Sequence, residues 1–431
     1  MTAPATTLRS RPSLPRSRRL VGVDAARGLA LLGMMAAHLL ERTTAAGDPS
    51  AAFALVNGRS SATFAVLAGV GLALADGGHA GGRTPYARMV ARTSVRALCI
   101  LLIGLVLTEA GPPVAVILQY YALSFLLLAP LLRLPAAVLG VGGLAWLGLA
   151  PVVSHVVRES TGLLGPGSQV GITRLLVDPS GSVTDLFLTG YYPVLTWFGY
   201  LLVGAAVGRL ALGRRGVALA VAGAGLLLAA GAAVVSSLLL GTAGARDVLT
   251  GVDPVFGRGT DGPWFGTAPT SSPWWLAIDT PHSGTAPDLI GTTGAALLAL
   301  GACLLLAGTV AGWALVPLAA AGSMTLSLYT VHVLAVLSDR PGLDPGQDWT
   351  VHAALALVFA TLWTLRFRRG PLEVGVAGVV DALAGPSTPA TAPDGTTGPA
   401  RAEAPDATGS TGRSVKGGRG GPGSGTDVHG A

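Results

Sequence analysis

The sequence predicts an all-α, polytopic membrane helix bundle of about ten transmembrane helices, with both termini cytoplasmic. The 431 residues are 51% hydrophobic and only 12% charged, whereas soluble domains carry about 25% charged residues. The mean hydropathy is +0.60, and apolar runs about as long as a bilayer is thick recur along the chain. A chain of this composition lacks the polar surface to cover itself in water, so we expect a multi-pass membrane protein.

Ten apolar runs approach the length of about 20 residues that a helix needs to cross a bilayer. They lie near residues 21–40, 60–76, 92–109, 114–132, 136–154, 191–212, 217–240, 288–308, 313–337 and 351–367. We expect Pro317 to break the ninth run, because proline interrupts a helix.

The distribution of arginine predicts the orientation, because cytoplasmic loops carry an excess of positive residues. If the N-terminus is inside, arginines fall on the inner segments, at positions within 9–19, 83–96, 133, 209–215 and 366–369. Most acidic residues then fall on outer segments. Both termini are therefore expected on the cytoplasmic side of the plasma membrane.

Composition divides the chain into three regions. Residues 1–19 are expected to form a basic cytoplasmic leader, since no small-residue cleavage site follows the first apolar run. Residues 20–382 form the transmembrane domain, and residues 383–431 form a low-complexity tail that we expect to be disordered. Cys99 and Cys303 lie in apolar runs, which argues against a disulfide framework and against a metal site.

Two outer segments are long, at about 155–190 and 241–287. The second contains Trp264, Trp274 and Trp275. These tryptophans fit an aromatic belt at the membrane interface, and they also fit a lid or a platform for a sugar. The 62 glycines of the chain suit close helix contacts, which permits a homo-oligomer without requiring one.

The first apolar run, VGVDAARGLALLGMMAAHLL, carries Asp24, Arg27 and His38. At about 100° per residue their spacing brings all three close to one stripe of a helix. Ionisable side chains inside a span are costly and therefore mark functional sites by default. The alternative is structural: Asp24 and Arg27 form an ion pair at the helix start, and His38 bonds to a neighbouring carbonyl.

Other polar residues gather in the outer half of the predicted bundle. They are Asn57, Arg59, Tyr191, Tyr192, His282 and His332. Four of them also have a structural alternative. Tyr191 and Tyr192 could be interface anchors, His332 could be a hydrogen-bonded interior residue, and His282 could be an exposed loop residue. One face of the first helix would connect this outer layer to the cytoplasm, as an enzyme with a cytoplasmic donor and an external acceptor requires, and as a transporter requires too.

The stretch RLVGVDAARGLALLGMMAAHLL resembles the first helix of the transmembrane acyltransferase superfamily, which includes the acyltransferase-3 proteins and the bacterial relatives of heparan-alpha-glucosaminide N-acetyltransferase. Arg19, Asp24, Arg27, Gly28 and His38 fall on the pattern R-x₄-D-x-x-R-[GA]-x-A, with a His or Asn fourteen residues after the Asp. The similarity continues in NGRSSATFAVLAGVGLAL, LTGYYPVLTWFGYLLVGAAVGRL, PHSGTAPDLIGTTG and AAAGSMTLSLYTVHVL. The closing FRRGPLEVGVAGVVDAL is similar to the end of the related DUF418 membrane family, so the resemblance covers roughly residues 19–382.

The resemblance implies an acyl transfer across the membrane. Acyl-CoA would enter from the cytoplasm as a co-substrate, with Asp24 and Arg27 at its entrance and with no tightly bound cofactor. His38 matches the first-helix histidine that is the usual general base in acyltransferase-3 proteins, a role that suits imidazole. The residues expected around an extracytoplasmic glycan or small-molecule acceptor are Asn57, Arg59, Tyr191, Tyr192, His282 and His332.

The chain departs from the glucosaminide N-acetyltransferase branch at one point. In that branch the position of His38 is typically Asn, and the catalytic histidine lies in the loop after the first helix. Here that loop reads ERTTAAGDPS and contains no histidine. Either His38 is the base, or another residue such as His282 is, or the protein has lost acyl transfer.

The leading hypothesis is an integral membrane acyltransferase that moves an acetyl or similar group from cytoplasmic acyl-CoA to an extracytoplasmic carbohydrate or envelope glycan. The first alternative is a transporter or flippase for a small anionic or glycolipid solute, which would suit Arg27 and Arg59, although no inverted repeat is evident. The second is a non-catalytic membrane protein that retains the fold. The lipid bilayer is the expected surrounding, and no nucleic acid partner is expected.

Overall fold

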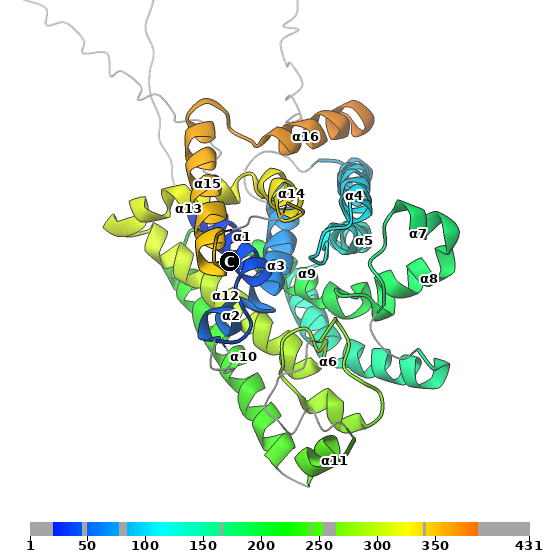
Figure 1. Ribbon diagram of the computed structural model, residues 1–431. Coiled ribbons are helices and arrows are strands. Elements are labelled where there is room, and N and C mark those ends of the chain that lie inside the picture. The colour runs from blue at the N-terminus through cyan, green and yellow to red at the C-terminus, as the bar shows by residue number, and fades with distance from the viewer. Residues whose placement is uncertain are drawn as a thin grey trace, which may run out of the picture. The chain divides into compact units, whose positions relative to one another are not determined.

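The structure is a computed structural model, which describes residues 20–44, 50–76, 84–163, 167–241, 244–252, 264–338 and 342–386. Within these ranges the chain forms helices and no strand, which confirms the all-α prediction (Figure 1). They belong to the unit Met1–Ala390. The expected leader at 1–19 lies outside the described residues, and so does the expected tail from residue 387 onward.

The helices follow the apolar runs of the sequence. The longer ones are α1 (Val21–Leu39), α3 (Arg59–Ala75), α4 (Tyr86–Glu109), α6 (Ala136–Thr161), α9 (Val194–Gly208), α10 (Arg215–Gly241), α12 (Ala286–Ala307) and α15 (Pro345–Arg366). The shorter ones are α2 (Ala51–Val56), α5 (Leu118–Leu128), α7 (Ile172–Val177), α8 (Pro179–Thr184), α11 (Ala245–Val252), α13 (Val316–Gly322), α14 (Thr325–Ala335) and α16 (Pro371–Ala384). Three elements are 3₁₀ helices, η1 (Ala129–Leu131), η4 (Pro273–Ala277) and η5 (Val310–Leu315), and η2 (Asp185–Thr189) is a π-helix. Every one of the ten predicted runs falls on one or more of these elements.

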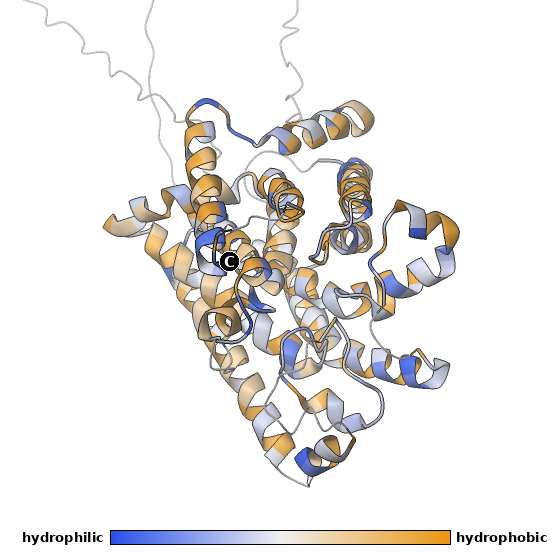
Figure 2. Ribbon diagram, in the orientation of Figure 1, coloured by the Kyte–Doolittle hydropathy of each residue, from blue (hydrophilic) through white to orange (hydrophobic). Residues whose placement is uncertain are grey.

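Several of the described helices can cross a bilayer. Six segments are long and apolar enough: Ala51–Ala75, Tyr86–Glu109, Ala136–Thr161, Arg215–Gly241, Ala286–Ala307 and Pro345–Arg366. Two bent pairs, Pro179–Thr189 with Val194–Gly208 and Val310–Gly322 with Thr325–Ala335, raise the number to as many as eight. Figure 2 shows apolar residues along α10, α12 and α15, whereas hydrophilic residues gather on α8 and α11. The chain is a multi-pass membrane protein; the count of ten spans and the orientation stay predictions.

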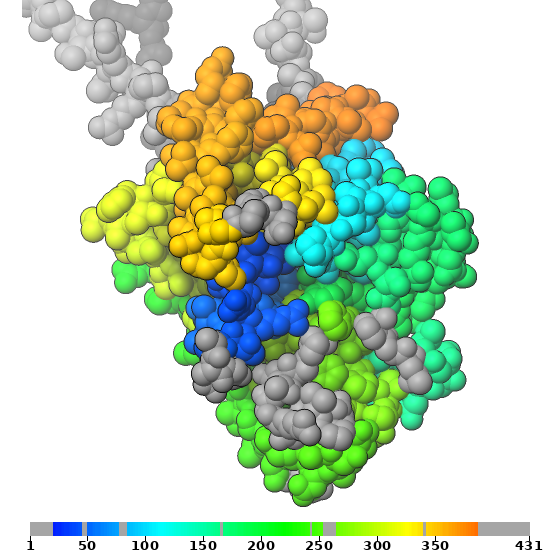
Figure 3. Space-filling model, viewed as in Figure 1, coloured from blue at the N-terminus to red at the C-terminus, as the bar shows by residue number. Residues whose placement is uncertain are grey.

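Helix α1 lies inside the bundle, where it packs against α3, α12, α13 and α15. Figure 3 shows it in dark blue, set back between the α15 and α4 regions of the surface. A Cβ on Gly28 would lie 2.0 Å from the carbonyl oxygen of Leu318 in α13, and a Cβ on Gly322 would lie 1.7 Å from that of Asp24. Only glycine permits backbones to approach so closely, so α13 fixes α1 at the predicted motif itself.

The break expected at Pro317 occurs later in the chain. Pro317 lies in the first turn of α13, where a helix tolerates proline. The 69° bend separates α13 from α14, at residues 323–324. Glu373 of α16 caps the N-terminus that this bend creates, because its Oε1 accepts hydrogen bonds from the backbone N–H groups of Leu326 (2.8 Å) and Ser327 (3.2 Å).

The two long outer segments contain helices as well as loops. The expected loop at 155–190 begins as helix, since α6 continues to Thr161 and α7 and α8 follow. In the second segment Trp275 is fully buried in a small core with Leu240 and Leu249. Its ring contacts Trp264, with 5.3 Å between ring centroids. Trp275 therefore packs the segment together rather than anchoring it at an interface.

Candidate functional site

Asp24 and Arg27 form the ion pair that the sequence allowed. Arg27 Nη1 lies 3.2 Å from Asp24 Oδ1, and Arg27 Nη2 donates a 3.3 Å hydrogen bond to the carbonyl oxygen of Leu67 in α3. A Cβ on Gly71 would lie 2.1 Å from Arg27 Nη2, so α3 leaves room for the guanidinium at this level. The pair holds the arginine head group in a fixed place between α1 and α3.

A cavity of about 300 Å³ begins at this arginine. Its walls come from α1, α3, α4, α5 and α14, and its lining residues include Arg27, Arg96 and Tyr329. Arg27 and Met34 both line it and lie about 10 Å apart along α1. The cavity therefore follows α1 from the D-x-x-R motif toward His38 and ends about one helical turn before that residue.

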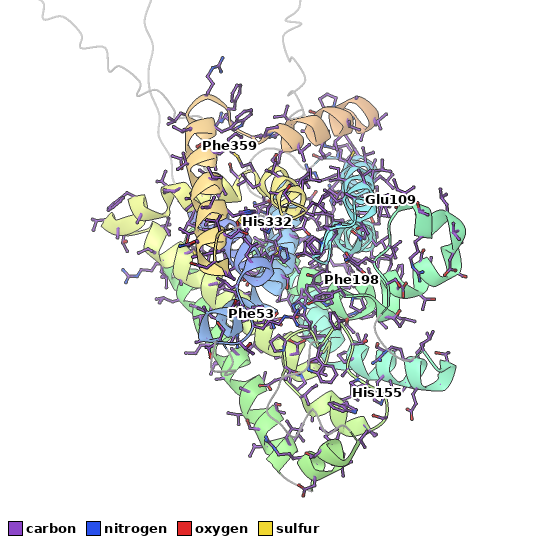
Figure 4. The ribbon with its side chains drawn as sticks, viewed as in Figure 1. Phe53, Glu109, His155, Phe198, His332 and Phe359 are labelled. Atoms are coloured by element: carbon purple, nitrogen blue, oxygen red, sulfur yellow. The ribbon has the colours of Figure 1, made fainter. Side chains whose placement is uncertain are left out.

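Beyond the end of the cavity, His38 begins a continuous chain of side chains. His38 Nδ1 lies 3.0 Å from Nε2 of His332 on α14, and the two rings are stacked at 7°. His332 Nδ1 lies 2.7 Å from Nδ1 of His352 on α15. His352 Nε2 lies 3.7 Å from Oδ1 of Asp348, one turn earlier on the same helix. Figure 4 labels His332 close to the ribbons of α1, α14 and α15, and labels His155 apart from them on α6.

His282 forms the second cluster of the site, in the segment before α12. Its side chain contacts three aromatic rings, Tyr191 and Tyr192 with centroids 4.8 and 5.8 Å away, and Trp197 stacked at 12°. Its φ is 63°, a region that residues other than glycine rarely adopt and that occurs preferentially at functional sites. His282 is therefore an ordered, enclosed residue, contrary to the exposed-loop alternative.

The electrostatic surroundings keep His282 neutral. Burial lowers the pKa of this imidazole to about 3, and the nearby positive charges of Arg42 and of His38, when protonated, lower it in the same direction. The Nδ1 atom is buried and has no hydrogen-bond partner among the described residues. A neutral ring with an unsatisfied nitrogen can bind a hydroxyl or amide group of a ligand.

Asn57 and Arg59 flank the turn between α2 and α3. Gly58, between them, has φ 70°, and a Cβ there would lie 2.8 Å from Cβ of Pro281. This turn therefore packs on the residue preceding His282. The side chain of Arg59 is exposed and donates to the carbonyl oxygen of Ala54, so it is directed back along its own segment rather than into the cluster.

Residues 19–237, half of the chain, match the family model described as heparan-alpha-glucosaminide N-acetyltransferase, catalytic. The chain belongs to this family. No individual curated protein matches it.

The part matched to the heparan-alpha-glucosaminide N-acetyltransferase family contains α1, the cavity walls on α3, α4 and α5, and the tyrosines at the start of α9. His282, α14 and α15 lie after it. The structure thus brings predicted His38 and His332 into direct contact and joins predicted His282 to Tyr191 and Tyr192. It keeps Asp24 and Arg27 together at the other end of the cavity.

Three charged or titratable residues of the site were not predicted as site residues from the sequence: Asp348 and His352, which continue the contacts of His38 and His332, and Arg96, which lines the cavity. Asp348 and His352 lie four residues apart on α15, so they share one face of that helix. An acid and a histidine at this spacing, at the start of the apolar run 351–367, were the available signal. Arg96 lies in the apolar run of α4 and was counted only as an orientation marker.

Proposed function

We propose that this protein is an integral membrane acyltransferase of the plasma membrane. It transfers an acetyl or similar acyl group from cytoplasmic acyl-CoA to an extracytoplasmic carbohydrate or envelope glycan. The observation that carries this proposal is the cavity that leads from Arg27 and Arg96 along α1 to Met34, about one turn before His38. The proposed topology adds α1 and α5 to the eight candidate spans, which gives ten spans and cytoplasmic termini.

The arginine end of the cavity suits the phosphates of acyl-CoA. Arg96 is within electrostatic reach of Arg27, Arg92 and Arg369, and Arg92 is fixed by an ion pair with Asp381 of α16 at 2.8 Å. Guanidinium groups bind phosphate through paired hydrogen bonds. The apolar walls beyond them suit the pantetheine arm, so that the thioester would reach the outer part of α1.

His38 is the proposed general base. Its Nδ1 contacts His332, so Nε2 is the nitrogen that can accept a proton from the acceptor hydroxyl or amine. As that proton leaves, the acceptor oxygen or nitrogen attacks the thioester carbonyl carbon. The carbon–sulfur bond then breaks, and the sulfur takes the bonding electron pair and a proton to leave as the thiol of CoA.

Tyr329 is placed to stabilise the negative charge on the thioester oxygen during this attack. Its hydroxyl oxygen accepts a 3.3 Å hydrogen bond from the backbone N–H of Ile117, and no described residue accepts its hydrogen. A polarised hydroxyl on a residue that lines the cavity can donate to the developing oxyanion. The backbone bond from Ile117 holds the oxygen in position for this role.

The cluster around His282 is the proposed acceptor site. Aromatic faces of Tyr191, Tyr192 and Trp197 suit the apolar faces of a sugar ring, and the neutral imidazole suits one of its hydroxyls. His282 is also the second candidate for the base, because its Nδ1 has no described partner. Asn57 precedes Gly58, which packs on Pro281 next to this cluster, and its amide is a further proposed acceptor contact.

Acetyl transfer by the purified protein tests the proposal. We would supply labelled acetyl-CoA and a mixture of envelope glycans to the protein in detergent, and compare the wild type with His38→Ala and His282→Asn. We expect transfer by the wild type and its loss in His38→Ala. His155→Ala serves as the matched control, because this buried histidine lies on α6, away from the site, and we expect it to keep transfer.

The outcomes separate the classes of function. Transfer that persists in His38→Ala and disappears in His282→Asn assigns the base to His282. Binding of acetyl-CoA without any transfer supports a non-catalytic protein that retains the fold. A wild-type protein that does not bind acetyl-CoA contradicts the proposal, and uptake of an anionic or glycolipid solute into proteoliposomes would then support the transporter.

A further inference from the structure

The hydrogen bonds that link His38, His332 and His352 couple the tautomers of the three rings. A hydrogen bond between two imidazole nitrogens needs one N–H group and one lone pair. If His38 Nε2 accepts a proton from the acceptor, the hydrogen of the neutral ring is on Nδ1, which then donates to His332 Nε2. By the same rule His332 Nδ1 donates to His352 Nδ1, and the hydrogen of His352 is on Nε2, toward Asp348.

Asp348 favours the arrangement in which each ring donates its hydrogen toward Asp348 over the arrangement in which each ring donates toward His38. If each ring donated toward His38 instead, the Nε2 atom of His352 would carry a lone pair and would face the carboxylate of Asp348, 3.7 Å away. A lone pair beside a carboxylate is repulsive, whereas an N–H group beside it is attractive. A carboxylate at this end therefore favours the tautomers that leave the lone pair on His38 Nε2.

We propose that Asp348, His352 and His332 form a relay that fixes His38 in its Nδ1–H tautomer and spreads the positive charge that arises when His38 Nε2 accepts a proton. This inference rests on the proposed acyl transfer with His38 as its base. The three residues act through His38, so they are positioning residues. The relay extends the logic of a histidine oriented by a carboxylate over two further rings.

The relay balances with the transfer step. The acceptor O–H or N–H bond breaks, and its proton adds to His38 Nε2. The Nδ1 hydrogen of His38 shifts toward His332 Nε2, and that of His332 toward His352 Nδ1. The positive charge thereby moves to His352, whose Nε2–H group lies 3.7 Å from the carboxylate of Asp348 and is stabilised by its negative charge. After the carbon–sulfur bond breaks, each hydrogen returns, and His38 Nε2 gives its proton to the sulfur of CoA.

Burial and a hydrogen bond between α15 and α1 hold the residues of the relay in fixed positions. His332 and His352 are 3% and 8% exposed, and buried polar groups cost free energy unless they are paired. α15 is also tied to α1 by a 3.2 Å hydrogen bond from Trp349 Nε1 to the carbonyl oxygen of Leu32. Trp349 follows Asp348 directly, so this bond holds the carboxylate end of the relay at a fixed distance from α1.

Kinetics of three variants test the relay. In Asp348→Asn the carboxylate is lost, and in His352→Gln the ring link is broken. A wrong histidine tautomer costs about 10⁴-fold in a catalytic triad, where the carboxylate contacts the base directly. Asp348 acts on His38 through two further rings, so we expect a smaller loss, of about 10²-fold in kcat for acetyl transfer in each variant, while KM for acetyl-CoA stays unchanged. Asp348→Glu restores the charge and should recover most of kcat.

Asp344→Asn is the matched control. Asp344 caps the same helix by accepting from Gln347 N at 2.8 Å, and Asn is an equally good cap. This variant removes one negative charge four residues from Asp348, and we expect its kcat to equal that of the wild type. A kcat that falls equally in Asp344→Asn and Asp348→Asn would show a general charge effect and overturn the relay.

A second measurement does not depend on turnover. Nitrogen-15 NMR of histidine-labelled protein in lipid bilayers distinguishes the two tautomers, and His38→Ala assigns the signals of that residue. We expect the Nδ1–H form of His38 in the wild type and a mixture of forms in Asp348→Asn. An Nε2–H form in the wild type, or no change in Asp348→Asn, overturns the relay.

The kinetic outcomes separate the relay from the proposed function. If His38→Ala is inactive while Asp348→Asn and His352→Gln keep full kcat, the relay fails and the proposed function stands. If the wild type transfers nothing, both fail.

Discussion

Tyr329 lines the cavity, and a backbone donor holds its hydroxyl. Replacing it by Phe removes the hydroxyl and keeps the ring, so the packing of α14 should survive. Because one oxyanion donor contributes about 10²- to 10³-fold to kcat, we expect Tyr329→Phe to lower kcat by that factor, with a small change in KM for acetyl-CoA. Steady-state kinetics of acetyl transfer measure both.

Tyr121 is the matched control for this change. It also lines the cavity, but its hydroxyl already donates a 3.0 Å hydrogen bond to the carbonyl oxygen of Ser61. Tyr121→Phe should therefore lower kcat only a few-fold, through a small loss of stability. Equal losses in the two variants would contradict a specific role for Tyr329.

His282 makes stability depend on pH. Its pKa is about 3 in the folded protein because the ring is buried, against about 6.5 in an unfolded chain. Between these pH values the unfolded chain binds a proton that the folded protein excludes, so the free energy of unfolding falls as pH decreases from about 6.5 toward 3. We expect His282→Asn, which tolerates positive φ, to flatten this decline. The measurement is Tm against pH for both proteins, and parallel curves would contradict it.

Single residues also show what a sequence can predict about the site. The stripe of Asp24, Arg27 and His38 was predictable because it depends only on the period of one helix. The contacts of His38 with His332 and of His332 with His352 join helices far apart in the chain. No local pattern contains such contacts, so His332 was predicted only as an acceptor-side residue and His352 was missed.

At the scale of helices, the close approach of α1 and α13 should be essential. A Cβ on Gly28 would meet the backbone of Leu318 at 2.0 Å, and backbone cannot move aside as a flexible side chain can. We expect Gly28→Ala to destabilise the protein by about 1–3 kcal/mol, as overpacking does. Gly231→Ala on α10 is the control, because nothing lies within 4 Å of its Cβ and alanine favours helix. Thermal unfolding in detergent compares the two, and equal Tm values would contradict the expectation.

The helices themselves were largely predictable, and their bends were not. The apolar run at 217–240 matches α10, and the run at 288–308 matches α12, because both depend on composition alone. The bend between α13 and α14 has its cap on α16, where Glu373 binds the N-terminus of α14. A long-range cap leaves no local sign, and Pro317, the local sign that was present, fits the start of a helix instead.

Across the whole molecule, the arginine end of the cavity and the histidine chain lie at opposite ends of α1. Asp24 and Arg27 occupy the first two turns of α1, and His38 its last turn. If acyl-CoA binds from the cytoplasm, this order along the helix requires the N-terminus of α1 to face inward. The proposed chemistry therefore depends on the predicted orientation, which arginine counts alone support.

Reporter fusions test this orientation directly. Six proposed spans separate residue 20 from Arg209, and a seventh, α10, ends at Gly241. We therefore expect alkaline phosphatase to be active when fused after Gly241, on the outer side, and inactive when fused after Ala384, where α16 ends. Green fluorescent protein should give the opposite result, because it fluoresces only when it folds inside. Active phosphatase only after Ala384 would invert α1 and place Arg27 on the outer side, where it cannot meet cytoplasmic acyl-CoA. Active phosphatase at both positions would contradict the proposed three spans between Gly241 and Ala384.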